Sequence, residues 1–437
     1  MKICIVDPYL NRNYRINKDT SGGYGTGNNF GSSLIPFILK KALKRNSFWP
    51  PLFVAYTFAT LKKAGHDVNY LNEIPKNIDD FSFFIVTSSI VCCELEIETI
   101  KKIKLLNKKV FVIGPFASNK PELYNNAGGT VLKGEPEFYF LNKKDFDEDL
   151  NQKIVNVDSN YDLDDLPYPG WSDIIKNFEN IDNLFSKDRS LPILATRGCP
   201  YSCFQYCVYP LQQGRKVRQR SVENIVAEMK YWKDKHNVKM FIFRDPVFSI
   251  NKKHTMDLCN KLIDENLNIN FAVETHLRIL DSELIILLKK AGLKTAIVGV
   301  EGYDPEVLKN AGRFTITKDL QSTKIKELEK EKIQVSAMFI IGFPTDNNDT
   351  INKTIEYAKK LNTAYAQFSV WTPYPGTPIF EKFKDKLITN NFQNFDQYTL
   401  VYKHNLFSKN EIKKFLEKCY TSYYFRIKWL FKYLVER

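Results

Sequence analysis

Residues 1–150 alternate between short apolar runs and longer amphipathic stretches. Runs of four or five apolar residues are typical of buried parallel strands, and apolar residues spaced three or four apart indicate helices. Strands that alternate with helices predict a doubly wound parallel sheet of Rossmann-like class. The predicted strands are residues 3–6, 68–71, 83–87, 110–113 and 131–133, with helices near 52–64 and 95–106.

Residues 151–189 are predicted to be a linker, because the segment 156–173 is polar and acidic and contains Pro167, Pro169 and Gly170. From residue 190 the strand and helix pattern becomes more regular. Six consecutive βα units over residues 190–380 predict a partial (βα)6 TIM-type barrel, and residues 381–437 predict a helical extension. The barrel strands are predicted at residues 193–196, 240–243, 269–273, 295–300, 335–341 and 366–371, with helices at 222–235, 256–265, 283–291, 319–332 and 349–361.

Chemically informative residues follow each predicted barrel strand, which is where TIM-type barrels carry their active sites. One rim is therefore expected to collect all of them. In strand order they are a cysteine loop at 199–207, Arg244-Asp245-Pro246, Glu274-Thr275-His276, Glu301-Gly302, Gly342-Phe343-Pro344 and residues 372–377.

The cysteine loop holds Cys199, Cys203 and Cys207, three of the chain's eight cysteines. Thiolates in such a loop suit an iron–sulfur cluster, a zinc ion or a structural role. A closed zinc site needs four ligands, yet no other Cys or His lies within twenty residues on either side. The spacing therefore favours a cluster with one open position, with zinc and structural cysteines as alternatives. The remaining cysteines fit free thiols of a reducing compartment.

The net charge of +13 is spread along the chain of 437 residues, so a solvated surface is favoured over nucleic-acid binding. No run is apolar enough for a transmembrane segment, and no signal peptide is apparent, which predicts a cytoplasmic protein. The tail from residue 408 is a basic amphipathic helical stretch. Packing on the barrel is its favoured role, and attachment at a membrane surface is the alternative.

A glycine-rich segment, residues 21–31, lies between the first strand and its helix. It matches neither the dinucleotide-binding fingerprint nor a phosphate-binding P-loop. A mobile loop and a loop that closes over a ligand are equally acceptable interpretations.

Together these residues resemble the radical S-adenosylmethionine enzymes, in the branch with an N-terminal cobalamin (B12)-binding-like domain. The resemblance covers nearly the whole chain. The chain departs from the family in one place, because the last gap, between Cys203 and Cys207, holds Phe204, Gln205 and Tyr206, one residue more than usual. The matching segments are RGCPYSC at 197–203, Asp245-Pro246-x-Phe248, Gly299-Val300-Glu301, IGFP at 341–344, PYPGT at 373–377 and Gly134-Glu135-Pro136-Glu137.

The resemblance implies that Cys199, Cys203 and Cys207 bind a 4Fe–4S cluster whose fourth iron holds S-adenosylmethionine. It also implies that reduction of the cluster cleaves that molecule to a 5′-deoxyadenosyl radical. Residues expected to contact the cofactors are Asp245, Glu274, Glu301, Gly342, Pro344 and Tyr206. Each has a structural alternative: a turn, a helix cap, a salt bridge or simple packing. His276 is expected either to face substrate or to cap its strand. The basic run at 215–220 is expected to be solvated, apart from one or two residues.

By analogy with the family, the expected reaction is cobalamin-dependent methylation of an unactivated carbon. A radical enzyme without cobalamin is the second hypothesis, and a noncatalytic metal-stapled binding protein is the third. The expected partners are a small-molecule substrate, lipid- or glycan-linked, and an electron donor such as flavodoxin or ferredoxin, with no nucleic acid.

Overall fold

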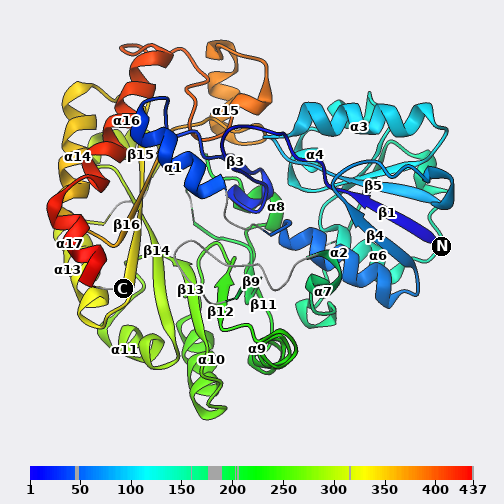
Figure 1. Ribbon diagram of the computed structural model, residues 1–437, viewed down its shortest axis with the longest axis horizontal. Helices are drawn as coiled ribbons and strands as arrows, with labels where there is room; N and C mark the ends of the chain where they lie inside the picture. The colour runs from blue at the N-terminus through cyan, green and yellow to red at the C-terminus, as the bar shows by residue number, and fades with distance from the viewer. Residues whose placement is uncertain are drawn as a thin grey trace.

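The computed structural model describes residues 1–44, 49–158, 160–175, 189–201, 203, 206–313 and 316–435. Its first half is built on a parallel sheet with strand order β4-β1-β5-β6-β7-β8 (Figure 1). The predicted strands and both predicted helices are confirmed. The strands are β1 (Lys2–Val6), β4 (Asp67–Leu71), β5 (Phe83–Thr87), β6 (Val110–Ile113), β7 (Thr130–Lys133) and β8 (Ile154–Asn156).

Helices cover both faces of this sheet because its strands are apolar on both sides. In β1, Ile3 and Ile5 join the apolar cluster of one face, and Cys4 and Val6 join that of the other. Strand β8 was not predicted, and it extends the sheet into the segment expected to be a linker. The helices are α2 (Leu52–Lys63), α3 (Cys93–Leu105), α4 (Pro115–Asn119), α5 (Pro121–Asn125) and α6 (Pro136–Asn142).

The glycine-rich insertion after β1 is folded against both halves of the chain. It contains β2 (Ile16–Asn17), β3 (Thr26–Gly27) and α1 (Leu34–Lys44), a helix that the sequence analysis missed. Lys18 is fully buried and forms ion pairs with Asp7 at 2.8 Å and Glu96 at 2.9 Å. These contacts anchor the insertion at the carboxyl edge of the first sheet, which faces the second half of the molecule (Figure 1).

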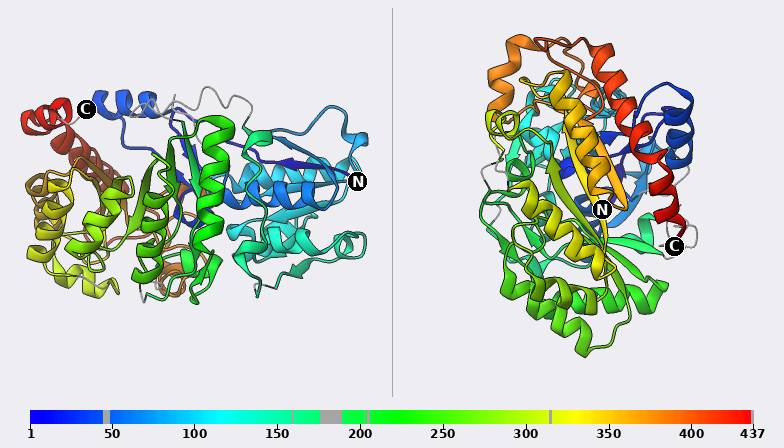
Figure 2. Two further views of the ribbon diagram at one scale, coloured as in Figure 1. Left: turned by 90° about the horizontal axis from the view of Figure 1, so that it is seen from below. Right: turned by 90° about the vertical axis from the view of Figure 1, so that its left-hand side faces the viewer.

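The second half contains the predicted partial barrel, a parallel sheet of strand order β16-β15-β14-β13-β12-β9 with helices outside it (Figures 1 and 2). In β15 and β16 buried residues alternate with partly exposed ones, so every second side chain faces the barrel interior. The strands are β9 (Ser190–Ile193), β12 (Met240–Phe243), β13 (Asn270–Thr275), β14 (Leu293–Glu301), β15 (Gln334–Ile341) and β16 (Tyr365–Val370).

The barrel helices begin where capping residues predict, for example at Asp281, whose side chain accepts a hydrogen bond from the Leu284 N–H. They are α9 (Val222–His236), α10 (Lys252–Asp264), α11 (Ser282–Lys290), α12 (Pro305–Asn310), α13 (Lys318–Lys330) and α14 (Asn348–Leu361). The short helix α7 (Trp171–Ile174) lies between the two sheets in sequence, and the short helix α8 (Tyr209–Gln213) follows the cysteine loop.

The first barrel strand was predicted three residues too late. It ends at Ile193, and Thr196 instead belongs to β10 (Thr196–Arg197), which pairs antiparallel with β11 (Arg218–Gln219). The cysteine loop is therefore closed at its base by a hairpin.

The tail forms two helices after α15 (Pro378–Phe383), namely α16 (Lys409–Tyr424) and α17 (Ile427–Val435). Helix α16 packs on the edge strand β16. There the Tyr420 hydroxyl accepts a hydrogen bond from the Phe368 N–H at 3.1 Å, and Tyr424 binds Ala366 in the same way at 3.0 Å. Tyrosines thus satisfy backbone groups that an open sheet edge leaves unpaired. Among the described helices, none is long and apolar enough to cross a bilayer.

Candidate active site

A cavity of about 680 Å³ lies inside the partial barrel, where the carboxyl ends of its strands meet. Its volume is in the range of small-molecule sites. The predicted rim is confirmed in part, because residues that follow several strands line this one cavity. They include Cys199, Cys203, Tyr206, Cys207, Glu274, His276, Glu301, Trp371 and Thr372, and Arg313, which follows α12, lines the same cavity.

All three cysteines of the loop lie on the cavity wall, Cys199 buried and the other two partly exposed. The backbone at Gly198 holds the start of the loop in place. Its φ is +95°, and a Cβ there would lie only 2.1 Å from the Lys216 carbonyl oxygen. Of the residues between the cysteines, Ser202, Phe204 and Gln205 fall outside the described part, so the extra residue is placed only through Tyr206.

The cysteines have unequal electrostatic surroundings. A hydrogen bond from the Cys207 thiol lowers the pKa of Cys203 to about 6, with burial opposing the shift and Arg313 adding to it. One sulfur can therefore be a thiolate near neutral pH, which is the form that binds metal. Among described residues, no three His, Cys, Asp or Glu side chains converge on one point as single-ion ligands. The three sulfurs line a wall instead, an arrangement that could hold a multi-iron cluster.

Glu301 lies beside the cysteine loop and pairs with Arg313 at 2.5 Å. A register shift between Gly299 and Glu301, together with a φ of +70° at Glu301, turns this side chain over the cavity. Burial raises the pKa of Glu301, and Arg313 opposes that rise. Tyr206, also buried here, has a hydroxyl with no hydrogen-bond partner among the described residues. Next to the cysteines, Glu301 therefore supplies a carboxylate, Arg313 a cation and Tyr206 a hydrogen-bond donor.

Glu274 connects the cavity to the N-terminal insertion. Its carboxylate lies 3.6 Å from the Arg244 guanidinium and accepts a hydrogen bond from the Tyr209 hydroxyl at 3.4 Å. Arg244 also pairs with Asp19 at 2.9 Å. Burial raises the pKa of Glu274, with Arg244 opposing the rise. The insertion is therefore tied by buried charges to a residue that lines the cavity.

Asp245, Gly342 and Pro344 do not belong to the cavity wall that the described residues form. The Asp245 carboxylate is fully buried and accepts hydrogen bonds from the backbone N–H groups of Ala195 and Thr196. It holds the turn that leads to the cysteine loop. The Gly342 carbonyl accepts a hydrogen bond from the Tyr402 hydroxyl at 2.8 Å. In this conformation Asp245 and Gly342 therefore have structural roles: Asp245 holds a turn, and Gly342 accepts a hydrogen bond from Tyr402.

His276 does line the cavity, and burial, followed by Arg313 and Arg278, lowers its pKa to about 4. A neutral imidazole is therefore present at the cavity wall at neutral pH. Sequence reasoning missed Arg313, because it follows α12 and not a barrel strand. It also missed Asp19, whose pairing with Arg244 joins segments far apart in the sequence.

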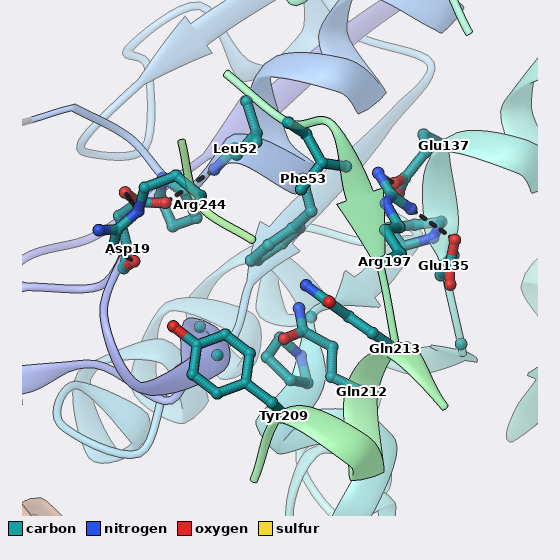
Figure 3. A pocket seen from close by; sticks show the side chains of 18 residues that line it. Asp19, Leu52, Phe53, Glu135, Glu137, Arg197, Tyr209, Gln212, Gln213 and Arg244 are labelled. Carbon is teal, nitrogen blue, oxygen red and sulfur yellow. Dashed lines mark hydrogen bonds and ion pairs between the residues drawn. The ribbon is translucent and has the colours of Figure 1, made fainter. Parts of the chain in front are cut away.

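A second, smaller cavity lies at the seam between the two sheets (Figure 3). At one side of it Arg197, at the start of the cysteine loop, pairs at 2.5 Å with both Glu135 and Glu137 (Figure 3). This contact uses the Gly-Glu-x-Glu turn. Arg218 joins Glu135, and Arg220 pairs at 2.6 Å with buried Glu228, so these two residues are the exceptions to the solvated basic run.

The seam cavity has a volume of about 60 Å³. That is room for about two water molecules, well below the roughly 300–1,000 Å³ of a small-molecule site. Gly22, Gly23, Gln212 and Gln213 occupy the space around it. A corrin ring does not fit between the two sheets in this conformation.

Comparison with known proteins shows which superfamily the barrel half of the chain matches. Residues 193–358 match the Radical SAM superfamily, whose members use a 4Fe–4S cluster and S-adenosylmethionine. Residues 193–358 therefore form a radical SAM domain, which favours an enzyme over the noncatalytic alternative.

Two curated relatives are named as methyltransferases. An uncharacterized methyltransferase of Pyrococcus horikoshii is 28% identical over 434 residues, covering 91% of this chain and 93% of that protein. The bacteriochlorophyllide d C-12(1)-methyltransferase of Chlorobaculum tepidum is 27% identical over 221 residues, covering 49% of this chain and 47% of that protein.

Solved structures share the fold of both halves. The cobalamin-dependent radical enzyme OxsB superposes with a TM-score of 0.67 at 13% identity, covering 96% of this chain and 66% of that one. The methyltransferase TsrM from Kitasatospora setae, with cobalamin and a 4Fe–4S cluster bound, gives 0.62 at 15% identity, covering 88% and 78%. The Rossmann-like sheet followed by a TIM-type partial barrel is thereby confirmed.

Proposed function

We propose that this chain is a radical SAM methyltransferase that methylates an unactivated carbon of a small molecule. The observation that carries the proposal is the single cavity at the barrel rim, where three cysteines face a buried carboxylate–guanidinium pair. The two curated relatives named as methyltransferases support methylation as the reaction.

Cys199, Cys203 and Cys207 are the proposed ligands of three irons of a 4Fe–4S cluster. When bound, the cluster and S-adenosylmethionine supply a 5′-deoxyadenosyl radical after one-electron reduction. Glu301, held by Arg313, is placed to accept hydrogen bonds from the amine or ribose of the cofactor. Tyr206 can donate from its unpartnered hydroxyl.

Asp245, Gly342 and Pro344 remain proposed cofactor residues only if the rim rearranges when the cofactor binds. Glu274 keeps its proposed role without such a change, because its carboxylate already lines the cavity. Its pairing with Arg244 positions it opposite the cysteine loop.

Cobalamin is the proposed methyl carrier, and the seam between the two sheets is its proposed place. Binding there requires the segment at Gly22 and Gly23 to move away from Gln212 and Gln213, since the present cavity is about 60 Å³. The competing function is a radical enzyme without cobalamin, and the closed seam favours it. Incubation with hydroxocobalamin followed by gel filtration decides between them. Retained corrin absorbance supports the methyltransferase, and its absence supports the competitor.

We further propose a cytoplasmic protein, free or attached at the membrane surface, that acts on a lipid- or glycan-linked substrate. Flavodoxin or ferredoxin is the proposed electron donor. Reduction of the reconstituted protein by flavodoxin, followed as bleaching of cluster absorbance, tests the donor. The proposed donor is wrong if neither flavodoxin nor ferredoxin reduces the cluster while dithionite does.

A further inference from the structure

Helices α1 and α17 expose large apolar side chains to solvent. Leu34 of α1 is 72% exposed, and Ile427 and Phe431 of α17 are 86% and 69% exposed. Phe37 and Ile38 of α1, with Phe425 and Leu430 near or in α17, are also exposed. Single exposed apolar residues are normal on protein surfaces, but a set of this size on two neighbouring helices marks an interaction site.

The two helices project from one face of the molecule. Both views in Figure 2 place α1 and α17 along the same edge, beside the end of the described chain. Helix α16 joins them, since it contacts both. At the start of α1 the Ser32 N–H donates to the Glu417 carboxylate of α16, which fixes one helix against the other. We call the exposed side chains of α1 and α17 the α1–α17 surface.

The positive charge of the α1–α17 surface favours an anionic partner. Helix α1 (LIPFILKKALK) and helix α17 (IKWLFKYLV) contain lysines and no Asp or Glu. Lys41 and Lys428 are exposed. Lys40 of α1 is buried and does not contribute to the exposed charge. Amphipathic helices with basic polar sides and large apolar side chains bind at the interface of anionic membranes.

We propose that the α1–α17 surface docks on an anionic lipid membrane. The apolar side chains enter the headgroup and acyl boundary, and the lysines pair with lipid phosphates. This inference concerns docking alone and does not rest on the proposed methyl transfer.

The docking surface lies close in sequence to the cavity. Thr20, Ser21 and Thr26 line the cavity, and a short connection, residues 27–33, leads from them into α1. The Gly27 N–H donates to the Asp396 carbonyl at 3.2 Å, which secures this connection to the C-terminal extension. A docked α1 is therefore joined to the cavity wall through this short connection.

Vesicle sedimentation of the full chain tests the proposal. Phosphatidylcholine vesicles with phosphatidylglycerol are expected to bind the protein, and pure phosphatidylcholine vesicles are expected to bind it weakly. The double variant Ile427→Asp/Phe431→Asp is expected to lose binding. Leu105→Asp, at an 82% exposed position on α3, is the matched control and is expected to bind as the unmodified chain does.

A second pair of variants tests the charge. Lys41→Ala/Lys428→Ala is expected to weaken vesicle binding by roughly thirtyfold, because each lysine contributes about 1 kcal/mol near an anionic surface. Lys101→Ala/Lys102→Ala on α3 removes the same charge elsewhere and is expected to have little effect. The docking proposal is wrong if the full chain stays in the supernatant with anionic vesicles or if the α17 variants bind normally. Lipid-free dimerisation that the α17 variants abolish would show that a second copy covers the surface, and would also overturn it.

Discussion

The Arg197 guanidinium lies 2.5 Å from the Glu135 carboxylate and joins the base of the cysteine loop to the carboxyl edge of the N-terminal sheet. Both side chains are almost completely buried, and Glu137 shares the same cation at 2.5 Å. The N-terminal half therefore positions the loop that carries the proposed cluster ligands. This contact makes the two halves one functional unit.

Arg197→Ala is expected to lower the free energy of unfolding by about 3–5 kcal/mol, because it leaves the buried Glu137 carboxylate without a cation and Glu135 with Arg218 alone. Urea denaturation followed by circular dichroism measures the loss. Lys230→Ala, which breaks an exposed i,i+4 pair with Asp234, is the control and is expected to cost less than about 0.5 kcal/mol. Similar losses in both variants would contradict a structural role for the Arg197 pairs.

Gly198→Ala is expected to disrupt the cysteine loop, because its Cβ would meet the Lys216 carbonyl oxygen at 2.1 Å. Iron bound per chain after anaerobic reconstitution is expected to fall severalfold. Gly214→Ala offers a matched control: its φ is +77°, but nothing lies within 4 Å of the added Cβ. That variant is expected to cost about 1 kcal/mol of stability and to retain iron. Equal iron content in the two variants would show that the loop tolerates the clash.

Because the pKa of Asp245 is raised in the folded protein, we expect the free energy of unfolding to depend on pH. Burial raises the pKa of its carboxyl from 3.8 to about 6, with hydrogen bonds from Thr196 and Ala195 opposing the rise. The folded state then binds more protons than the unfolded state between these two values. Stability therefore falls as pH rises from about 4 to 6, by about 3 kcal/mol for this group. Comparing unfolding of the unmodified chain and Asp245→Asn across this window isolates the contribution. A stability difference that stays constant with pH would refute it.

Arg313→Met is expected to weaken binding of S-adenosylmethionine about tenfold to a hundredfold. The change removes the cation that holds Glu301, and the buried carboxyl is then protonated and reoriented. Equilibrium dialysis with the reconstituted protein gives the dissociation constant. Arg278→Met, also at the cavity wall, serves as the comparison and is expected to have a smaller effect. A larger loss in the comparison variant would place the cofactor at the other side of the cavity.

The fold was largely predictable because its strands are apolar runs of parallel-sheet type. Strand β12 matches its predicted range, residues 240–243, since polar or charged residues bound it on both sides. Strand β8 was missed because only three residues pair and two of them are exposed. Helix α1 was missed because it follows a glycine-rich segment and packs on α16, a contact that no local pattern encodes.

The candidate site was predictable only as far as the position of each strand end. That position placed Cys199, Glu274 and Glu301 at the cavity. It could not give the direction of the side chain that follows a strand. Asp245 turns back to the Ala195 and Thr196 N–H groups instead of facing the cavity. Arg313 and Asp19 reach the site through tertiary contacts from loops, so sequence spacing held no signal for them.

The central claim is that the cysteines at the barrel rim hold a cluster that cleaves S-adenosylmethionine. Its most direct test is release of 5′-deoxyadenosine by the anaerobically reconstituted chain with dithionite and S-adenosylmethionine, quantified by chromatography. We predict release by the unmodified chain and none by the variant with Cys199, Cys203 and Cys207 changed to Ala, while Cys259→Ala, a buried thiol of α10, retains it. Cluster absorbance and 5′-deoxyadenosine release that survive in the triple variant would contradict the claim.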